Sequence, residues 1–193
     1  MTTYPLALPT HTGIRGIEFR AMNSVAYERS PFTFAGQAQA NAGQMWMADV
    51  TLPPMKRADA EKWVAWLVSL RGQFGTFLLG DPLASTASGT ATSATITGSA
   101  GDNSVTVAMT GTLLAGDWFS LGSGTSQRLY KVTADQNGNG TLEIYPSLRA
   151  DASAATADLT LPQGLFRLAS NETSWSVNEA AIYGISFSAM EAV

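Results

Sequence analysis

Side chains that commonly carry catalysis are scarce in this sequence. The chain has one histidine, His11, and no cysteine, so it lacks the residues for a thiolate nucleophile, a cysteine-ligated metal or a histidine-rich zinc site. His11 follows Pro5 and Pro9 and has no acidic neighbour, which favours a surface or interface imidazole over a catalytic one. The acidic residues single out no pair for glycoside hydrolysis. We therefore expect no enzymatic activity, no metal and no cofactor.

Two glycine-rich segments look like ligand loops but lack essential partners. Residues 135–140 resemble a calcium loop, yet Ile144 stands where the final glutamate ligand is needed, and Asn-Gly pairs are typical of tight hairpins. Residues 122–126 lack the lysine and the following helix of a phosphate-binding loop. We expect a hairpin turn at the first segment, with weak calcium binding as the alternative, and an ordinary loop at the second.

The charge balance excludes further classes of partner. The net charge of −4 and the pI near 4.9 argue against non-specific nucleic-acid binding. No apolar run approaches the roughly 18 residues of a membrane span, and the N-terminus lacks the features of a signal peptide. We expect a protein made in a cytoplasm that neither inserts into membranes nor binds nucleic acid specifically.

The first part of the chain predicts short antiparallel strands. Apolar residues alternate with a period of two over residues 14–50. Turns are expected at residues 22–24, 29–31 and 41–43, where Asn, Ser, Pro and Gly gather. Residues 2–12 show no period, and we expect them to form an extended arm that reaches a neighbouring subunit.

One helix is predicted over about residues 57–71. The residues that recur at the spacing of one helical face are Ala60, Trp63, Val64, Leu67 and Leu70. Arg71 is expected in the last turn, where a cation is favoured, and Gly72 supplies a left-handed cap. Trp66 and Val68 lie off the main stripe, which predicts that the helix is covered on more than one side.

Two segments that are far apart in the sequence share a pattern. Residues 75–80 and 164–169 both contain Gly-x-Phe-x-Leu and a small residue, and we predict that they are neighbouring strands. Small polar passages near both segments are typical of junctions at which domains are inserted. We therefore expect a mainly β fold with one α-helix. Residues 1–83 and 164–193 would form an antiparallel, sandwich-like domain, and residues 84–163 an inserted small β-barrel or β-sandwich domain.

Aromatic residues predict a contact surface in the outer domain. Trp46 lies between Met45 and Met47, so both faces of that strand carry large apolar side chains. Such strands in a chain of low charge indicate surfaces that other subunits cover, and these three residues are a candidate subunit interface together with His11. Ordinary core packing is the alternative.

The insert contains aromatic residues that could bind a ligand. Trp118, Tyr130 and Tyr145 lie on its expected strands. Aromatic rings on small β domains stack on sugars or receptors, but they equally form the core of such domains. They are candidate stacking residues for a carbohydrate or receptor ligand.

Several segments resemble structural proteins of long-tailed bacteriophages, of the distal tail and baseplate hub (minor tail) family. The segments that carry the resemblance are WVAWLVSLRGQFGTFLLGDP at residues 63–82, AGDWFSLG at 115–122, RLYKVTAD at 128–135 and FRLASNETSWSV at 166–177. They span most of the chain after residue 55, and they contain no catalytic signature.

The resemblance implies a specific role in the virion. It implies a ring-forming β domain with one helix and a small peripheral β domain. Six copies would assemble at the tail tip, between the tail tube protein and the tip hub proteins. The alternative is a carbohydrate- or receptor-binding tail module that acts through the inserted domain.

Overall fold

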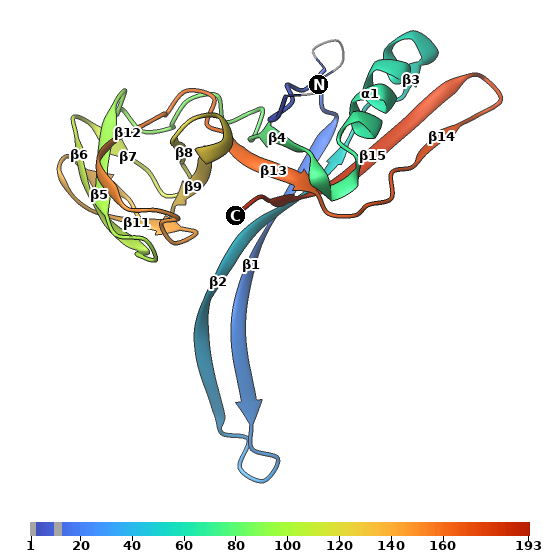
Figure 1. Cartoon of the computed structure of the whole chain (residues 1–193). Coiled ribbons are helices and arrows are strands. Elements are labelled where there is room, and N and C mark those ends of the chain that lie inside the picture. The colour runs from blue at the N-terminus through green and yellow to red at the C-terminus, as the bar shows by residue number, and fades with distance from the viewer. Residues whose placement is uncertain (1–2, 10–12) are drawn as a thin grey trace.

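The computed structural model describes residues 3–9 and 13–193. The fold is mainly β with antiparallel sheets, and the described residues contain one α-helix. Figure 1 shows a twisted sheet that carries the helix, a barrel-like sheet beside it, and a long hairpin that projects from both. None of the described helices is long and apolar enough to cross a membrane.

The first sheet gathers strands from both ends of the chain. Its seven strands follow the order β1-β2-β15-β13-β4, and β3 and β14 also pair with β15. The strands are β1 (Gly16–Arg29), β2 (Gly36–Thr51), β3 (Met55–Lys56), β4 (Thr76–Leu79), β13 (Gly164–Leu168), β14 (Trp175–Val177) and β15 (Ile182–Glu191). The predicted pairing of β4 with β13 is confirmed, with Phe77 opposite Phe166.

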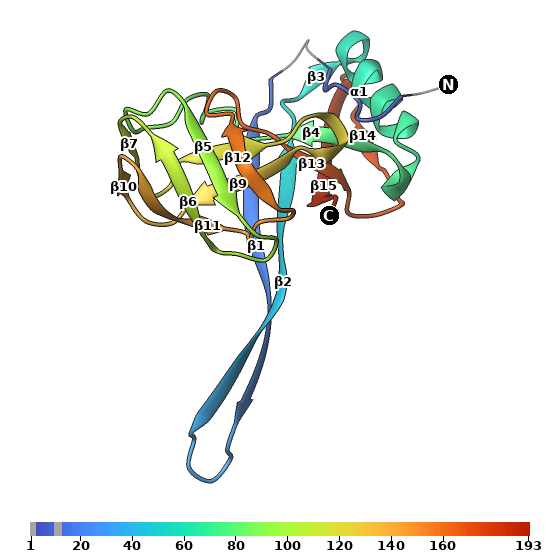
Figure 2. The same ribbon diagram turned by 60° about the vertical axis from the view of Figure 1, so that its left-hand side comes forward.

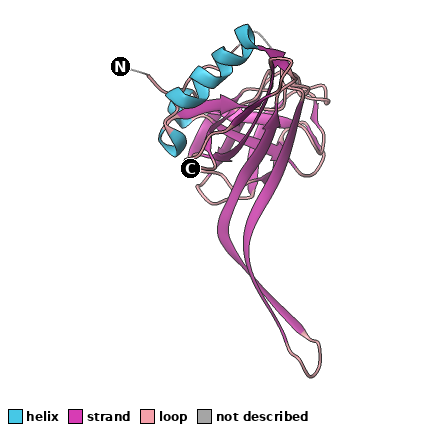
Figure 3. Cartoon of the chain, turned by 90° about the vertical axis from the view of Figure 1, so that its right-hand side faces the viewer, coloured by secondary structure: helices cyan, strands magenta, loops and turns pink. Residues whose placement is uncertain are grey.

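Helix α1 (Arg57–Ser69) covers one face of this sheet, away from the tip of the hairpin (Figure 3). Trp66 packs against Phe77 and Phe187 of the sheet, with ring centroids 5.0 and 5.6 Å apart. The helix ends at Ser69, so the prediction that Arg71 lies in its last turn is wrong.

Two further predictions concern the end of the helix and the side chains that lie off its main apolar stripe. The C-cap is Leu70, and the left-handed residue that follows it is Arg71, with a φ of +53°. The prediction that Gly72 supplies the cap is therefore wrong because the helix ends earlier, although Gly72 also has a positive φ of +67°. Trp66 is buried, as expected for a second covered side, but Val68 is 56% exposed because it points away from the sheet.

The second sheet is a nearly closed barrel with its own core (Figure 2). Its order is β12-β5-β6-β11-β9-β8, and an antiparallel bridge joins Ser120 of β8 to Asp158, the residue after β12. A small pair, β7-β10, completes it. The strands are β5 (Ala94–Gly98), β6 (Ser104–Met109), β7 (Thr112–Leu113), β8 (Trp118–Leu121), β9 (Arg128–Val132), β10 (Gln136–Asn137), β11 (Gly140–Tyr145) and β12 (Ala152–Ala157).

The chain leaves the first sheet after β4, forms the barrel and returns at β13. Buried residues form two clusters, one under each sheet, and Trp118 and Leu129 of the barrel strands belong to the cluster of the first sheet. The division into two independently folding domains stays a prediction.

The N-terminal strands differ from the expectation. Residues 14–50 do not form several short strands; β1 and β2 make one long hairpin whose loop spans residues 30–35. The turns predicted at residues 22–24 and 41–43 are wrong. A register shift lies there instead, between Asn23 and Val25. A bulge takes up extra residues of these types without reversing the chain.

Candidate interaction surface: a protruding hairpin

The far part of the β1–β2 hairpin, residues 21–43, projects into solvent (Figures 1 and 2). We call it the hairpin arm. Every residue of the arm is described, and all except Ser30 are exposed. An isolated two-stranded hairpin is marginally stable in water, so an exposed arm of this length calls for an explanation.

The arm has one apolar and one polar face. Residues directly opposite each other in antiparallel strands share a face. Val25 is opposite Ala40 and Tyr27 is opposite Ala38, whereas Glu28 is opposite Gln37. At the register shift, β2 contains two more residues than β1. Because side chains alternate between faces with a period of two, an even offset keeps each face unchanged. The apolar face of the arm therefore continues the face that packs into the core.

The tip of the arm presents two phenylalanine side chains. Phe32 is 92% exposed and Phe34 66% exposed. The loop that carries them is ordered by its own contacts: the N–H groups of Phe32 and Thr33 donate to Ser30 Oγ, each at 3.3 Å. The guanidinium of Arg29 lies 4.6 Å from the centre of the Phe34 ring. These contacts order the main chain of the tip and the ring of Phe34.

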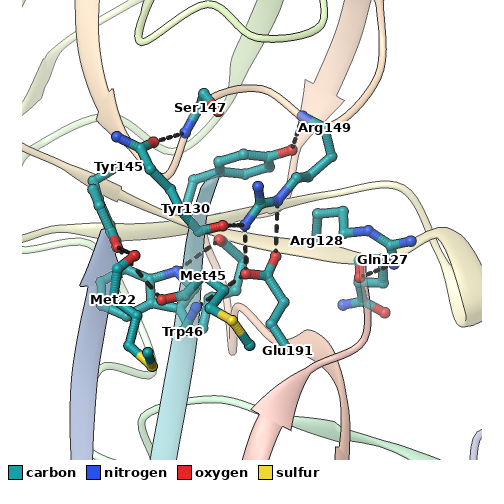
Figure 4. Close-up of polar contacts among 12 residues, drawn as sticks. Met22, Met45, Trp46, Gln127, Arg128, Tyr130, Tyr145, Ser147, Arg149 and Glu191 are labelled. Atoms are coloured by element: carbon teal, nitrogen blue, oxygen red, sulfur yellow. Dashed lines mark hydrogen bonds and ion pairs between the residues drawn. The ribbon is translucent and has the colours of Figure 1, made fainter. Parts of the chain in front are cut away.

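The base of the arm is fastened to the barrel by buried polar contacts (Figure 4). Arg149, in the segment after β11, donates from Nη2 to Glu191 Oε2 at 2.7 Å and to the main-chain carbonyl of Gln44 at 2.6 Å. Its Nε donates to Glu191 Oε1 at 3.2 Å. Glu191 also accepts the main-chain N–H of Trp46 at 3.1 Å. We call Arg149, Glu191 and the two β2 groups that they bind the clamp.

Two tyrosines of the barrel extend the clamp. The Tyr145 hydroxyl donates to the main-chain carbonyl of Met22 at 2.7 Å, so the barrel holds β1 as well as β2. The Tyr130 hydroxyl accepts the main-chain N–H of Arg149 at 3.1 Å. Burial raises the pKa of both phenols above the ordinary value of 10.0, because it disfavours the charged tyrosinate. Both groups therefore act as neutral hydrogen-bonding side chains.

The predicted interface residues Met45, Trp46 and Met47 fall on opposite faces of β2. Trp46 is 5% exposed, and its Nε1 donates to the carbonyl of Leu129 at 3.1 Å. The prediction is wrong for Trp46, because its ring packs inside the chain where the barrel meets the sheet. Met45 and Met47 are half-buried on the other face, where Met47 lies opposite Met190; they stay interface predictions. His11 lies outside the described residues.

Two of the three predicted stacking residues are buried and therefore not available to a ligand. Trp118 is 5% exposed and Tyr130 1% exposed. The Trp118 ring packs 4.9 Å from Trp46, and Tyr130 stacks on Phe119 at 5.3 Å. Tyr145 is half-buried against Trp46. The stacking prediction is wrong for Trp118 and Tyr130, because these rings fill the junction between the two sheets and the barrel core; for Tyr145 it stays a prediction.

The described part of the N-terminal segment lies on its own chain, contrary to the prediction of an arm. Leu6 forms a parallel bridge with Phe77, and its N–H donates to the carbonyl of Thr76 at 2.8 Å. The Tyr4 hydroxyl donates to the carbonyl of Ser69 at 2.7 Å. These contacts cover the outer edge of β4, an edge that would otherwise expose unpaired peptide groups.

The hairpin arm itself was missed by the sequence prediction. In the sequence, its signal is the alternation of Gln or Asn with Ala over residues 37–42, which comes shortly after Phe32 and Phe34 of the turn. Alanine is too small to mark a buried face, so this pattern predicts a strand without indicating what covers it.

The described residues contain no cluster of three or more acidic or histidine side chains that could hold a metal ion. Asp135, in the segment that resembles a calcium loop, accepts the main-chain N–H of Ala115 at 2.7 Å, and Gly138 takes a φ of +65° in the turn that follows.

No protein-family model matches this sequence, and no curated protein matches it.

Proposed function

We propose that this protein is a structural subunit of a bacteriophage tail, in the ring that joins the tail tube to the tip complex. The resemblance of residues 63–82, 115–122, 128–135 and 166–177 to distal tail and baseplate hub proteins supports this assignment. Tail tube and tip hub proteins would be its neighbours, and six copies would form the ring. The proposal includes no catalytic step.

The exposed hairpin arm is the observation that carries the proposal. Fixing the backbone of each residue costs about 1–2 kcal/mol of conformational entropy, and burial normally offsets that cost. The apolar face of the arm, with Val25 at 53% and Tyr27 at 63% exposure, lies uncovered. A contiguous apolar surface of this kind is typical of a protein–protein contact site. The arm is therefore suited to an assembly in which a neighbouring subunit covers it.

The low charge of the chain supports the same conclusion. Charged residues make up 13% of it, about half of the usual share. Permanent interfaces are depleted in charge, because each desolvated charge needs a partner. The arm follows this rule, since its polar face is made largely of uncharged Gln and Asn side chains.

Immunoelectron microscopy of phage particles tests the proposal. An antibody raised against the purified chain should label particles from the strain that encodes it, at the end of the tail distal to the head. Antibody absorbed beforehand with the purified chain provides the control. Absence of the chain from all particles, or label on the head, would refute the assignment.

A further inference from the structure

An apolar groove lies beside the N-terminal segment, at the outer edge of the first sheet. It has a volume of about 340 Å³ and is lined by Pro5, Leu6, Ala7, Leu8, Leu78 and Gln163. These lining residues, all described, carry no charge. The groove is therefore chemically suited to an apolar side chain rather than to an ion or a sugar.

The arm tip and this groove are matched in chemistry. Phe32 is 92% exposed, and the Ser30 turn already orders its main chain. Pre-organisation of this kind lowers the entropic cost of binding. A phenylalanine side chain is small enough for a groove of this volume.

The two surfaces cannot meet within one molecule. Its lining residues Leu6 and Leu78 place the groove beside β4. The ribbon shows β4 in the part of the molecule from which the arm points away (Figures 1 and 2). The clamp fixes the base of the arm in that direction. A contact between tip and groove therefore needs two molecules.

We propose that the arm of one copy lies on a second copy and inserts Phe32 into its groove. This inference rests on the proposed function, since it names the copy of the chain that covers the arm. The contact joins two different surfaces, so repetition gives a ring when the rotation closes. Each subunit would thus donate one arm and receive another.

The exposed aromatic side chains of the arm supply about half of the area that a stable contact needs. An aromatic side chain buries roughly 150–250 Å², so Phe32, Phe34 and Tyr27 together offer on the order of 400 Å² at their observed exposure. A stable interface needs about 800 Å² on each partner. The three aromatic side chains alone are too small, and Val25 and the alanines of the apolar face must contribute to the remainder.

Two complementary variants test the inference by native mass spectrometry and analytical ultracentrifugation of the full chain. Phe32→Asp replaces the apolar side chain at the tip by a charged one, and Ala7→Asp places a charge in the groove. Both positions are exposed, so the fold should be retained. Gln39→Asp, on the polar face of the arm, is the matched control. We expect the unchanged chain and the control to form closed oligomers. Each of the other two variants should lose them, with Kd raised about tenfold or more.

An equimolar mixture of Phe32→Asp and Ala7→Asp gives the decisive result. Phe32→Asp retains an intact groove and Ala7→Asp an intact tip. The arm of Ala7→Asp can therefore bind the groove of Phe32→Asp, but neither partner can bind a further copy. We expect a dimer containing one copy of each variant and no larger species. A monomeric mixture, oligomers that persist in Phe32→Asp, or an unchanged chain that stays monomeric would overturn the inference. The tail assignment is tested separately by the antibody label.

Discussion

Replacement of Arg149 by methionine tests how the clamp holds the two sheets together. The Glu191 side chain is fully buried, and that of Arg149 is 11% exposed. Two hydrogen bonds join the guanidinium to the carboxylate, and a third joins it to the Gln44 carbonyl. In Arg149→Met the buried Glu191 carboxylate would keep its hydrogen bond from the main-chain N–H of Trp46 but lose those from the guanidinium.

Removal of one member of a buried ion pair typically costs about 3–5 kcal/mol, because the other charge stays uncompensated in a poorly solvated site. We expect a loss in that range for Arg149→Met. The double variant Arg149→Met/Glu191→Met removes both charges and leaves one N–H and one carbonyl of β2 without these partners, at about 1–3 kcal/mol each. Apolar packing offsets part of that cost, so the double variant should be more stable than Arg149→Met alone.

Urea unfolding, followed by circular dichroism and tryptophan fluorescence, measures these free energies. Arg57→Met is the matched control, because Arg57 forms an ion pair with Glu61 in which the two side chains are 79% and 51% exposed. Exposed pairs contribute about 0–1 kcal/mol. A loss of less than about 1 kcal/mol in the free energy of unfolding of Arg149→Met would refute the argument that Arg149 compensates a buried charge. A double variant less stable than Arg149→Met would refute it too.

Two further predictions concern backbone packing and alkaline stability. In Gly80→Ala the new Cβ would overlap the carbonyl oxygen of Pro162, which should cost about 1–3 kcal/mol in thermal unfolding. Gly16→Ala, with open space around its Cβ, should be nearly neutral, and equal effects would contradict the packing. The pKa of Tyr130 is raised by burial above 10.0, so the unfolded chain ionises first and stability should fall as pH rises past 10.0. Tyr130→Phe should lose less stability over that range, and an equal loss would exclude this cause.

Local patterns were sufficient to predict the helix and one strand pairing. The helix follows from apolar residues at helical spacing, and its end shifts by two residues because Leu70 becomes the cap. The β4–β13 pairing follows from a motif repeated about ninety residues apart. Both signals survive because short-range periodicity reports directly which face is buried.

The hairpin arm could not be predicted in the same way. Turn-forming residues at positions 22–24 and 41–43 are compatible with a reversal of the chain and with a bulge. The register that brings Val25 opposite Ala40 decides between them. That register depends on the end of the hairpin where Arg29 pairs with Gly36, which lies outside both residues 22–24 and residues 41–43.

The aromatic residues of the insert illustrate a second limit. Composition shows that Trp118 and Tyr130 are large and apolar, but not whether they face solvent or another sheet. Trp46 and Leu129, which are 83 residues apart in the chain, share a hydrogen bond where the two sheets meet. Burial at this junction is a property of the packed pair of sheets and has no periodic signal in either segment.

The position of the clamp explains why a buried ion pair is used at this site. Strands rise about 3.3 Å per residue, so the tip lies roughly 35 Å from the base of the arm, and a tilt of about 10° there would move Phe32 by roughly 6 Å. Such a shift would carry a side chain out of a groove of about 340 Å³. The directional hydrogen bonds that Arg149 donates to Gln44 and that Glu191 accepts from Trp46 fix the angle of β2, whereas apolar packing tolerates small rotations. The double methionine variant should therefore weaken assembly more than its stability alone would indicate.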